Sequence, residues 1–62
     1  MTTEEALDVV RVERNQQKAR WSTFHDRQHE PHEWVGLIST YAVHGRFAEV
    51  AALAIAAMEA SS

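Results

Sequence analysis

The stretch from Phe47 to Ala60 constrains the fold of this chain more than any other. Its only charged residues are Glu49 and Glu59, and seven of its residues are alanine. We predict a helix from about Arg46 to Ala60, and a helix that is apolar almost all round must be buried on more than one side. Two arrangements meet this demand: a central position between two other helices, or a seam in a homodimer. We favour the homodimer.

A first helix is predicted from about Thr3 to Arg20. Thr2 and Glu5 stand at capping-box spacing, where each side chain bonds to the other residue's backbone N–H. One stripe of this helix is expected to face a core, and it consists of Leu7, Val10, Gln17 and Trp21, with Ala6 and Val9 beside it. The run from Glu13 to Lys18 is polar throughout. Such a run is usually a solvated face; alternatively, Glu13, Arg14 and Gln17 serve a polar site or an interface.

The second helix is predicted from Pro31 to about His44. Proline is tolerated in the first turn of a helix, and Gly45 suits the residue just after its end. Four residues at i, i+3, i+4 and i+7 form a stripe that is expected to face the core: Trp34, Leu37, Ile38 and Tyr41. Most aromatic side chains are also expected in the core, and these are Trp21, Phe24, Trp34, Tyr41 and Phe47. The predicted fold class is therefore all-α, a single domain (1–62) of three helices with a His-rich loop between the first two.

The length and charge of the chain exclude several classes of function. The chain has 62 residues and no cysteine, which excludes disulfides and thiolate zinc sites. Its net charge of −3 argues against non-specific DNA binding and is compatible with docking onto a basic protein surface. No apolar run is long enough to span a membrane, and the N-terminus is acidic where a signal peptide would be basic. We therefore expect a cytoplasmic protein that contacts neither membranes nor nucleic acid directly.

The segment between the first two helices is rich in histidine. His25, His29 and His32 alternate with carboxylates, and the residues suited to a divalent transition metal are His25, Asp26, His29 and Glu33. Pro31 interrupts the helix that would place these side chains on one face. The alternative is that they cap the second helix and close the loop by hydrogen bonds, with no cofactor. No catalytic residue is predicted, because the chain has neither a Gly-rich phosphate loop nor a nucleophile-elbow serine.

Several of these residues resemble a pattern of small phage and prophage proteins. The matching residues are Glu13-Arg14, Gln17, Trp21, His25-Asp26-Arg27-Gln28-His29, Glu33 and Tyr41-Ala42. The phage pattern has E-R-x-R-Q, then G-W-T-x-E-H-D-D-x-H-x-x-G-E-L, then Y-A. A looser similarity, over roughly Glu13 to Glu59, is to the MazG-like nucleotide pyrophosphohydrolases of phages. Those enzymes hold Mg²⁺ with an E-E-x-x-E run on the helix after the tryptophan.

The corresponding helix here, Leu37 to His44, contains no carboxylate, and Mg²⁺ requires hard oxygen ligands. Pyrophosphohydrolase activity is therefore not expected. The resemblance instead implies a small non-enzymatic phage-type protein that binds a host protein or protein complex. The function we predict is inhibition of a host defence complex in the bacterial cytoplasm, as anti-CRISPR proteins do, by occluding a basic nucleic-acid site. The expected interaction residues are Glu4, Glu5, Asp8, Glu13, Phe24, Asp26 and Arg27.

Two alternatives remain. The first is a degenerate MazG-like protein that binds a nucleotide, or hydrolyses it with a metal, through the His-rich segment. The second is a structural oligomer packed through the last helix.

Overall fold

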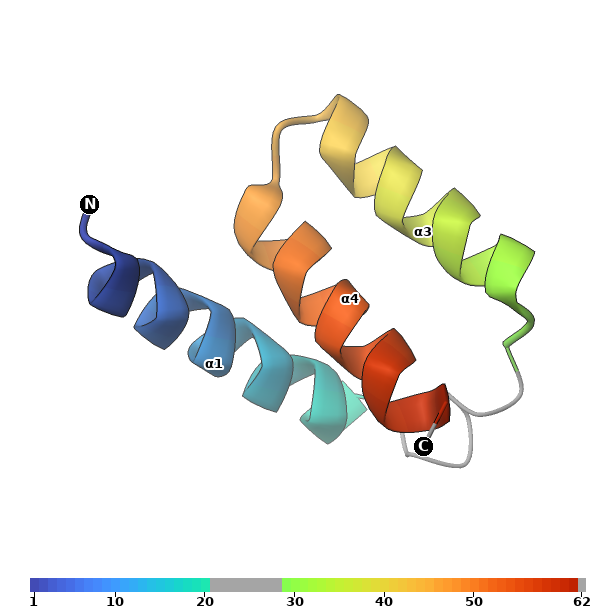
Figure 1. Ribbon diagram of the computed structural model, residues 1–62, viewed down its shortest axis with the longest axis horizontal. Coiled ribbons are helices and arrows are strands. Elements are labelled where there is room, and N and C mark those ends of the chain that lie inside the picture. Colours follow the sequence, from blue (N-terminus) through green and yellow to red (C-terminus); the bar gives the residue numbers. More distant parts are fainter. Residues whose placement is uncertain (21–28, 62) are drawn as a thin grey trace.

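The computed structural model describes residues 1–20 and 29–61, and this part of the chain is helical without a strand. Its helices are α1 (Thr3–Arg20), α3 (Pro31–Val43) and α4 (Phe47–Ser61). Figure 1 shows α4 between the other two helices, with α1 running in the same general direction as α4 and α3 running back against it. The all-α fold of three helices is confirmed. In a single chain the Ala-rich helix has the central position, because it packs against both α1 and α3, whereas α1 and α3 make little contact with each other.

The ends of the helices follow from local chemistry. The Thr2 hydroxyl accepts a hydrogen bond from the Glu5 N–H at 3.1 Å, and the Glu5 carboxylate accepts one from the Thr2 N–H at 3.0 Å. This confirms the capping box at the start of α1. Pro31 is the first residue of α3, where its missing N–H costs no helical hydrogen bond.

The turn between α3 and α4 is a Schellman motif. Gly45 has φ +70°, a left-handed conformation that glycine adopts without a Cβ clash. Its N–H donates to the Ala42 carbonyl at 3.0 Å, and the Arg46 N–H donates to the Tyr41 carbonyl at 3.1 Å. The predicted role of Gly45 is therefore confirmed. The second helix ends at Val43, one residue before the predicted end, and the third begins at Phe47, one residue after the predicted start.

The apolar core is small and lies between α3 and α4. Trp34, Leu53 and Ala56 form a buried cluster, with Ile38 and Tyr41 packed partly against it. Trp34, Ile38 and Tyr41 lie in the core as their spacing predicts.

Several residues that were predicted to face the core are exposed. Leu37 is 37% exposed and Phe47 is 71% exposed. Leu37 lies beside the buried stripe of α3, and among the described helices α4 is the main one that packs on α3, so the buried stripe is narrow. Phe47 begins α4 on the side opposite its buried residues Ala52, Leu53 and Ala56. On α1, Leu7 is also exposed.

Candidate functional site

The polar run of α1 has its arginine and one glutamine buried against α4. Arg14 and Gln17 are 7% and 5% exposed. The interpretation of this run as a solvated face is therefore wrong for these two residues, although Asn15 and Gln16 are exposed. Arg14 and Gln17 instead pack against α4 within the same chain, and Glu13 is half-buried. A functional site or an interface with a partner at these three residues stays a prediction.

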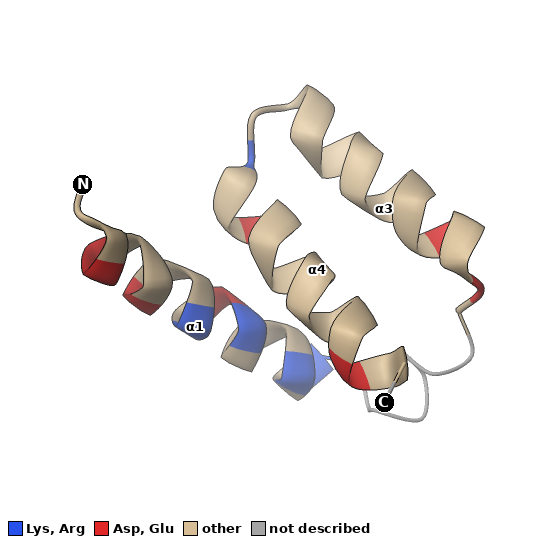
Figure 2. Cartoon of the chain, viewed as in Figure 1, with Lys and Arg blue, Asp and Glu red and all other residues tan. Residues whose placement is uncertain are grey.

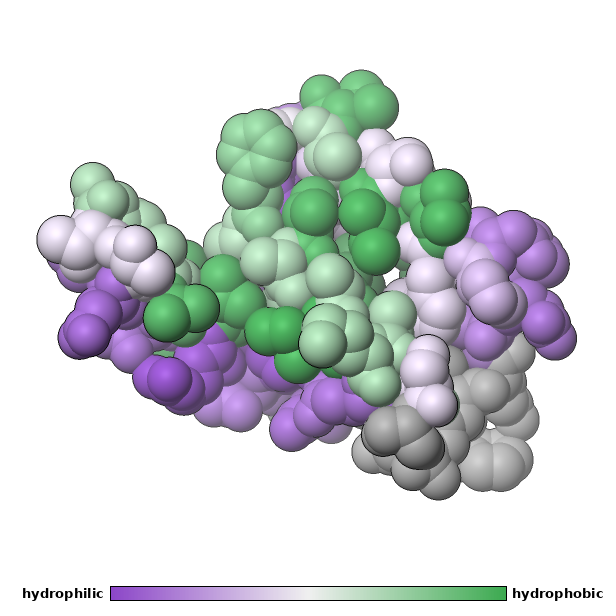
Figure 3. All heavy atoms as spheres, viewed as in Figure 1, coloured by the Kyte–Doolittle hydropathy of each residue, from purple (hydrophilic) through white to green (hydrophobic). Residues whose placement is uncertain are grey.

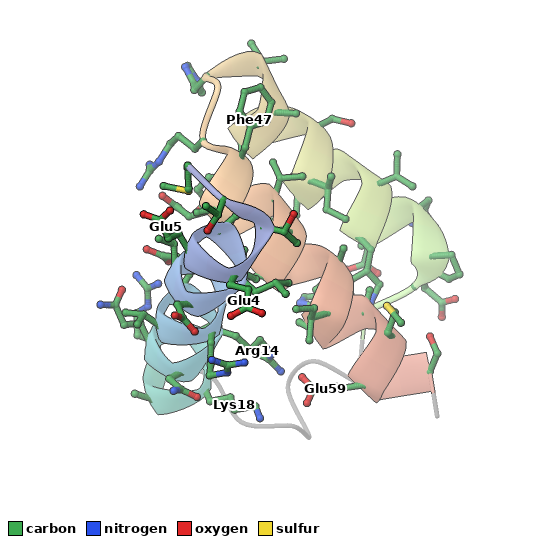
Figure 4. All side chains as sticks on the ribbon, turned by 60° about the vertical axis from the view of Figure 1, so that its left-hand side comes forward. Glu4, Glu5, Arg14, Lys18, Phe47 and Glu59 are labelled. Atoms are coloured by element: carbon green, nitrogen blue, oxygen red, sulfur yellow. The ribbon has the colours of Figure 1, made fainter. Side chains whose placement is uncertain are left out.

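The buried pair belongs to an ionic cluster that we call the α1–α4 clamp: Arg14, Gln17, Lys18 and Glu59. Arg14 Nε donates to Glu59 Oε1 at 2.7 Å, and Lys18 Nζ lies 3.4 Å from Glu59 Oε2. Arg14 also donates to Gln17 Oε1 at 3.5 Å. Figure 4 shows Arg14 and Lys18 directed from α1 toward Glu59 near the end of α4. The clamp fixes the C-terminal half of α1 to α4 and leaves no buried polar side chain without a hydrogen bond in the described part of the chain.

The clamp makes stability depend on pH. The hydrogen bond from Arg14, followed by the positive charges of Arg14 and Lys18, holds the pKa of Glu59 below its usual value of 4.5. A carboxylate with a lowered folded-state pKa stabilises the fold above its unfolded pKa, and this contribution is lost as pH falls through the folded pKa. The sequence alone indicates the clamp only weakly. Glu59 stands out as a charge on an apolar helix, but nothing in the sequence shows that Arg14 is its partner.

We therefore expect Glu59→Gln to lower the melting temperature above pH 4.5 and to have little effect well below it. At low pH the protonated wild-type side chain resembles the amide of the variant. Thermal melts of both proteins across this range would check the prediction, and Glu4→Gln, on the exposed start of α1, is the matched control. A melting-temperature difference that stays constant down to acid pH would contradict the assignment.

The described end of the His-rich segment forms a corner at the start of α3. His29 Nδ1 lies 3.3 Å from Glu33 Oε2, and the His29 ring meets the Trp34 ring edge-on at a centroid distance of 4.9 Å. The Glu33 carboxylate also accepts the Glu30 N–H at 3.2 Å. The Glu30 N–H, followed by the hydrogen bond with His29, lowers the pKa of Glu33. His29 and Glu33 thus lie together at the capped start of α3, in line with the capping part of the alternative for this segment. The predicted closure of the loop falls on residues outside the described ranges.

The predicted metal set is only partly described. His29 and Glu33 lie together, whereas His25 and Asp26 lie outside the described residues. Within residues 1–20 and 29–61, no group of three His, Cys, Asp or Glu side chains is placed to hold a metal ion. A divalent metal at His25, Asp26, His29 and Glu33 stays a prediction.

Beside the corner, an open pocket of about 350 Å³ lies between the start of α3 and the end of α4. Its described lining consists of His29, Pro31, Trp34, Ala57, Ala60 and Ser61. Ser61 donates its hydroxyl to the Ala57 carbonyl at 2.8 Å, and His29 already contacts Glu33. The pocket therefore offers mainly apolar and aromatic surface, which suits an apolar side chain better than a charged substrate.

The predicted interaction residues fall into two groups. Glu4, Glu5 and Asp8 are exposed on the first turns of α1, and Glu13 is half-buried. Phe24, Asp26 and Arg27 lie outside the described residues.

The exposed carboxylates share one outward face with two valines. We call this the acidic face of α1: Glu4, Glu5, Asp8, Val9 and Val12. Val9 and Val12 are 41% and 57% exposed. Asp8 pairs with Arg11 at 2.7 Å, and the backbone and side-chain hydrogen bonds of Thr2 lower the pKa of Glu5. Figure 2 shows acidic residues on the first turns of α1 and mostly basic residues on its later turns.

A second surface was missed by the sequence reasoning about interaction residues. The outward side of α4 carries Phe47, Ile55 and Met58, and Phe47 and Met58 are each more than 70% exposed. Figure 3 shows hydrophobic residues gathered over α4 and along its borders with the two neighbouring helices. The signal was present in the spacing, which places Phe47 and Met58 opposite the buried alanines of α4 and Ile55 at the edge of the same surface.

Comparisons with known proteins identified no relative of this chain. A scan against protein-family models found no match, and neither did searches of curated proteins and of solved structures. The resemblance to small phage proteins and to MazG-like enzymes therefore stays a prediction. Among the described helices, none combines the length and the apolar character needed to cross a membrane.

Proposed function

We propose that this chain is a small non-enzymatic protein that acts by binding another protein, and that its target is a basic surface. The observation that carries the proposal is the acidic face of α1, which exposes three carboxylates and two valines along the same side of one helix. The target class that fits best is the nucleic-acid site of a host defence complex, occluded as an anti-CRISPR protein would occlude it.

The chemistry of this face suits such a target. Carboxylates complementary to a basic groove accelerate association and favour the correct orientation, and their effect weakens as salt rises. The exposed valines supply apolar area that is removed from water when the surfaces meet. Val9 and Val12 lie among the carboxylates, so charge and apolar contact act at one place on the target.

The fold leaves this face open to a partner. The clamp joins the other half of α1 to α4, through Arg14 and Lys18 on Glu59. Figure 1 shows the N-terminal half of α1 diverging from α4, so that its outward side is clear of the rest of the described helices.

The test uses two double variants that change the net charge equally. Glu4→Gln with Asp8→Asn removes two negative charges from the acidic face and leaves the Thr2–Glu5 capping box in place. Asn15→Lys with Gln16→Lys adds two positive charges at exposed positions on the other half of α1. We expect the wild-type chain to capture a basic nucleic-acid-binding complex from a bacterial lysate and to displace nucleic acid from it.

The first double variant is expected to lose most of this capture and displacement, and the second to retain most of both. Equal loss in the two variants would show that net charge alone is responsible and would contradict a specific face. Recovery of no stable partner by the wild-type chain would count against the proposal as a whole.

A further inference from the structure

We propose that a second copy of this chain packs antiparallel against the outward side of α4, forming a two-fold symmetric dimer. The contact surface, which we call the α4 stripe, consists of Phe47, Val50, Ala51, Ala54, Ile55 and Met58. It is a different surface from the acidic face of α1, so this proposal goes beyond the proposed function and does not depend on it.

The α4 stripe is apolar along its whole length. Phe47, Ala51, Ala54 and Met58 follow each other at steps of four, three and four residues, the spacing of the apolar seam between two packed helices. They lie opposite Ala52, Leu53 and Ala56, which are buried inside the chain. The alanines at the centre of the stripe leave room for a second helix to approach closely.

The stripe is complementary to itself when one copy is reversed. A two-fold axis midway between Ala52 and Leu53 places Phe47 opposite the partner's Met58 and Ala51 opposite the partner's Ala54. The same axis places Val50 opposite the partner's Ile55. The large side chains Phe47 and Met58 therefore meet at both ends of the interface. Val50 and Ile55 meet beside the middle, and the small alanines meet at the centre. Each copy then uses the same patch, as an isologous interface requires, and Met sulfur meets an aromatic ring.

No charge on α4 opposes this contact. Glu59 is held in the clamp by Arg14, and Glu49 is paired with Arg46, so both carboxylates of the helix are neutralised within the chain. Because α1 runs in the same direction as α4 (Figure 1), reversing one copy brings the acidic start of one α1 to the same end of the dimer as the basic end of the other. Charge at the edges of the dimer is therefore complementary.

The exposed apolar surface and the small core both favour a second copy. Phe47, Ile55 and Met58 are exposed, and Val50, Ala51 and Ala54 between them are half-buried, so every side chain of the stripe keeps surface that a partner can cover. The described core contains four buried apolar residues, whereas ten large hydrophobic side chains are exposed. Chains of this length often gain the missing stability from oligomerisation.

The first experiment is sedimentation equilibrium of the full chain, with Ala54→Glu as the test and Ala42→Glu as the control. Ala54 lies near the two-fold axis, so the variant places two carboxylates close together without a counter-charge. Ala42 is exposed on α3, away from the stripe. We expect a dimer at tens of micromolar for the wild type and the control, and a weakening of about a hundredfold, or 2.7 kcal/mol, for Ala54→Glu. Circular dichroism would show that all three chains are folded.

The second experiment tests the direction of packing, which the lack of cysteine makes simple. The Phe47→Cys variant and the Met58→Cys variant are each oxidised alone, and an equimolar mixture of the two is oxidised in parallel. The proposal predicts a disulfide-linked dimer in the mixture and little in either chain alone. A disulfide-linked dimer formed by either variant alone would indicate parallel packing, and it would overturn the proposed geometry.

A wild-type chain that is monomeric at tens of micromolar, or a dimer that Ala54→Glu leaves intact, would overturn the proposal. A monomer that captures a different protein through Phe47 and Met58 would do the same. None of these outcomes would affect the acidic face of α1, whose double variant removes only edge charges and is expected to weaken the dimer far less than Ala54→Glu.

Discussion

Replacing Trp34 by alanine is expected to leave the chain largely unfolded at room temperature. Trp34 is the largest buried side chain of the core, packed against Leu53 and Ala56 on α4. Truncation of a buried tryptophan or phenylalanine costs about 3–5 kcal/mol, and a domain this small rarely has more than that in total. Far-ultraviolet circular dichroism and a urea titration would measure the loss.

Two variants make this result specific. Val35→Ala, at the exposed neighbouring position, should change stability little. Trp34→Phe keeps an aromatic ring in the core and should lie between the wild type and Trp34→Ala. If Trp34→Ala unfolded at the same urea concentration as Val35→Ala, the α3–α4 contact would not be the main source of stability.

Replacing Arg14 by alanine is expected to have the next largest effect. The change removes the donor to Glu59 and leaves the buried Gln17 without its described arginine partner. A hydrogen bond removed from a buried polar group costs about 1–3 kcal/mol. The lower half of this range is the better guide here, because the Glu59 side chain is 42% exposed and water will solvate its freed carboxylate.

The chain supplies its own control in Arg11. Arg11 pairs with Asp8 on the exposed side of the same helix, with both side chains about 70% exposed, and such pairs are worth under about 1 kcal/mol. Arg14→Met would separate charge from packing, since it keeps an unbranched stem of similar length. Equal loss of stability in Arg11→Ala and Arg14→Ala would show that the clamp does not hold α1 on α4.

Local chemistry made the helix ends predictable. Capping by Thr2 and Glu5, and the left-handed conformation of Gly45, depend on residues a few positions apart, so their spacing in the sequence is sufficient. The stripe of Trp34, Ile38 and Tyr41 was predictable for the same reason.

The surfaces were harder to predict because they depend on how many sides of each helix are covered. Phe47 has the character of a core residue, and only the position of α4 between two helices shows that its side of the helix faces outward. Arg14 has the character of a solvated residue, and its burial depends on Glu59 approaching from a helix far along the chain. Patterns on one helix do not contain that information.

The order of the helices along the chain has a consequence for how the protein folds. α3 and α4 are joined by a three-residue turn, so their pairing is local and is expected to form early. The bond between Arg14 and Glu59 joins residues 45 positions apart, and α1 can dock only after α4 exists. We therefore expect a helical hairpin as the folding nucleus and attachment of α1 as the late step. Changes in the clamp would then accelerate unfolding more than they slow folding.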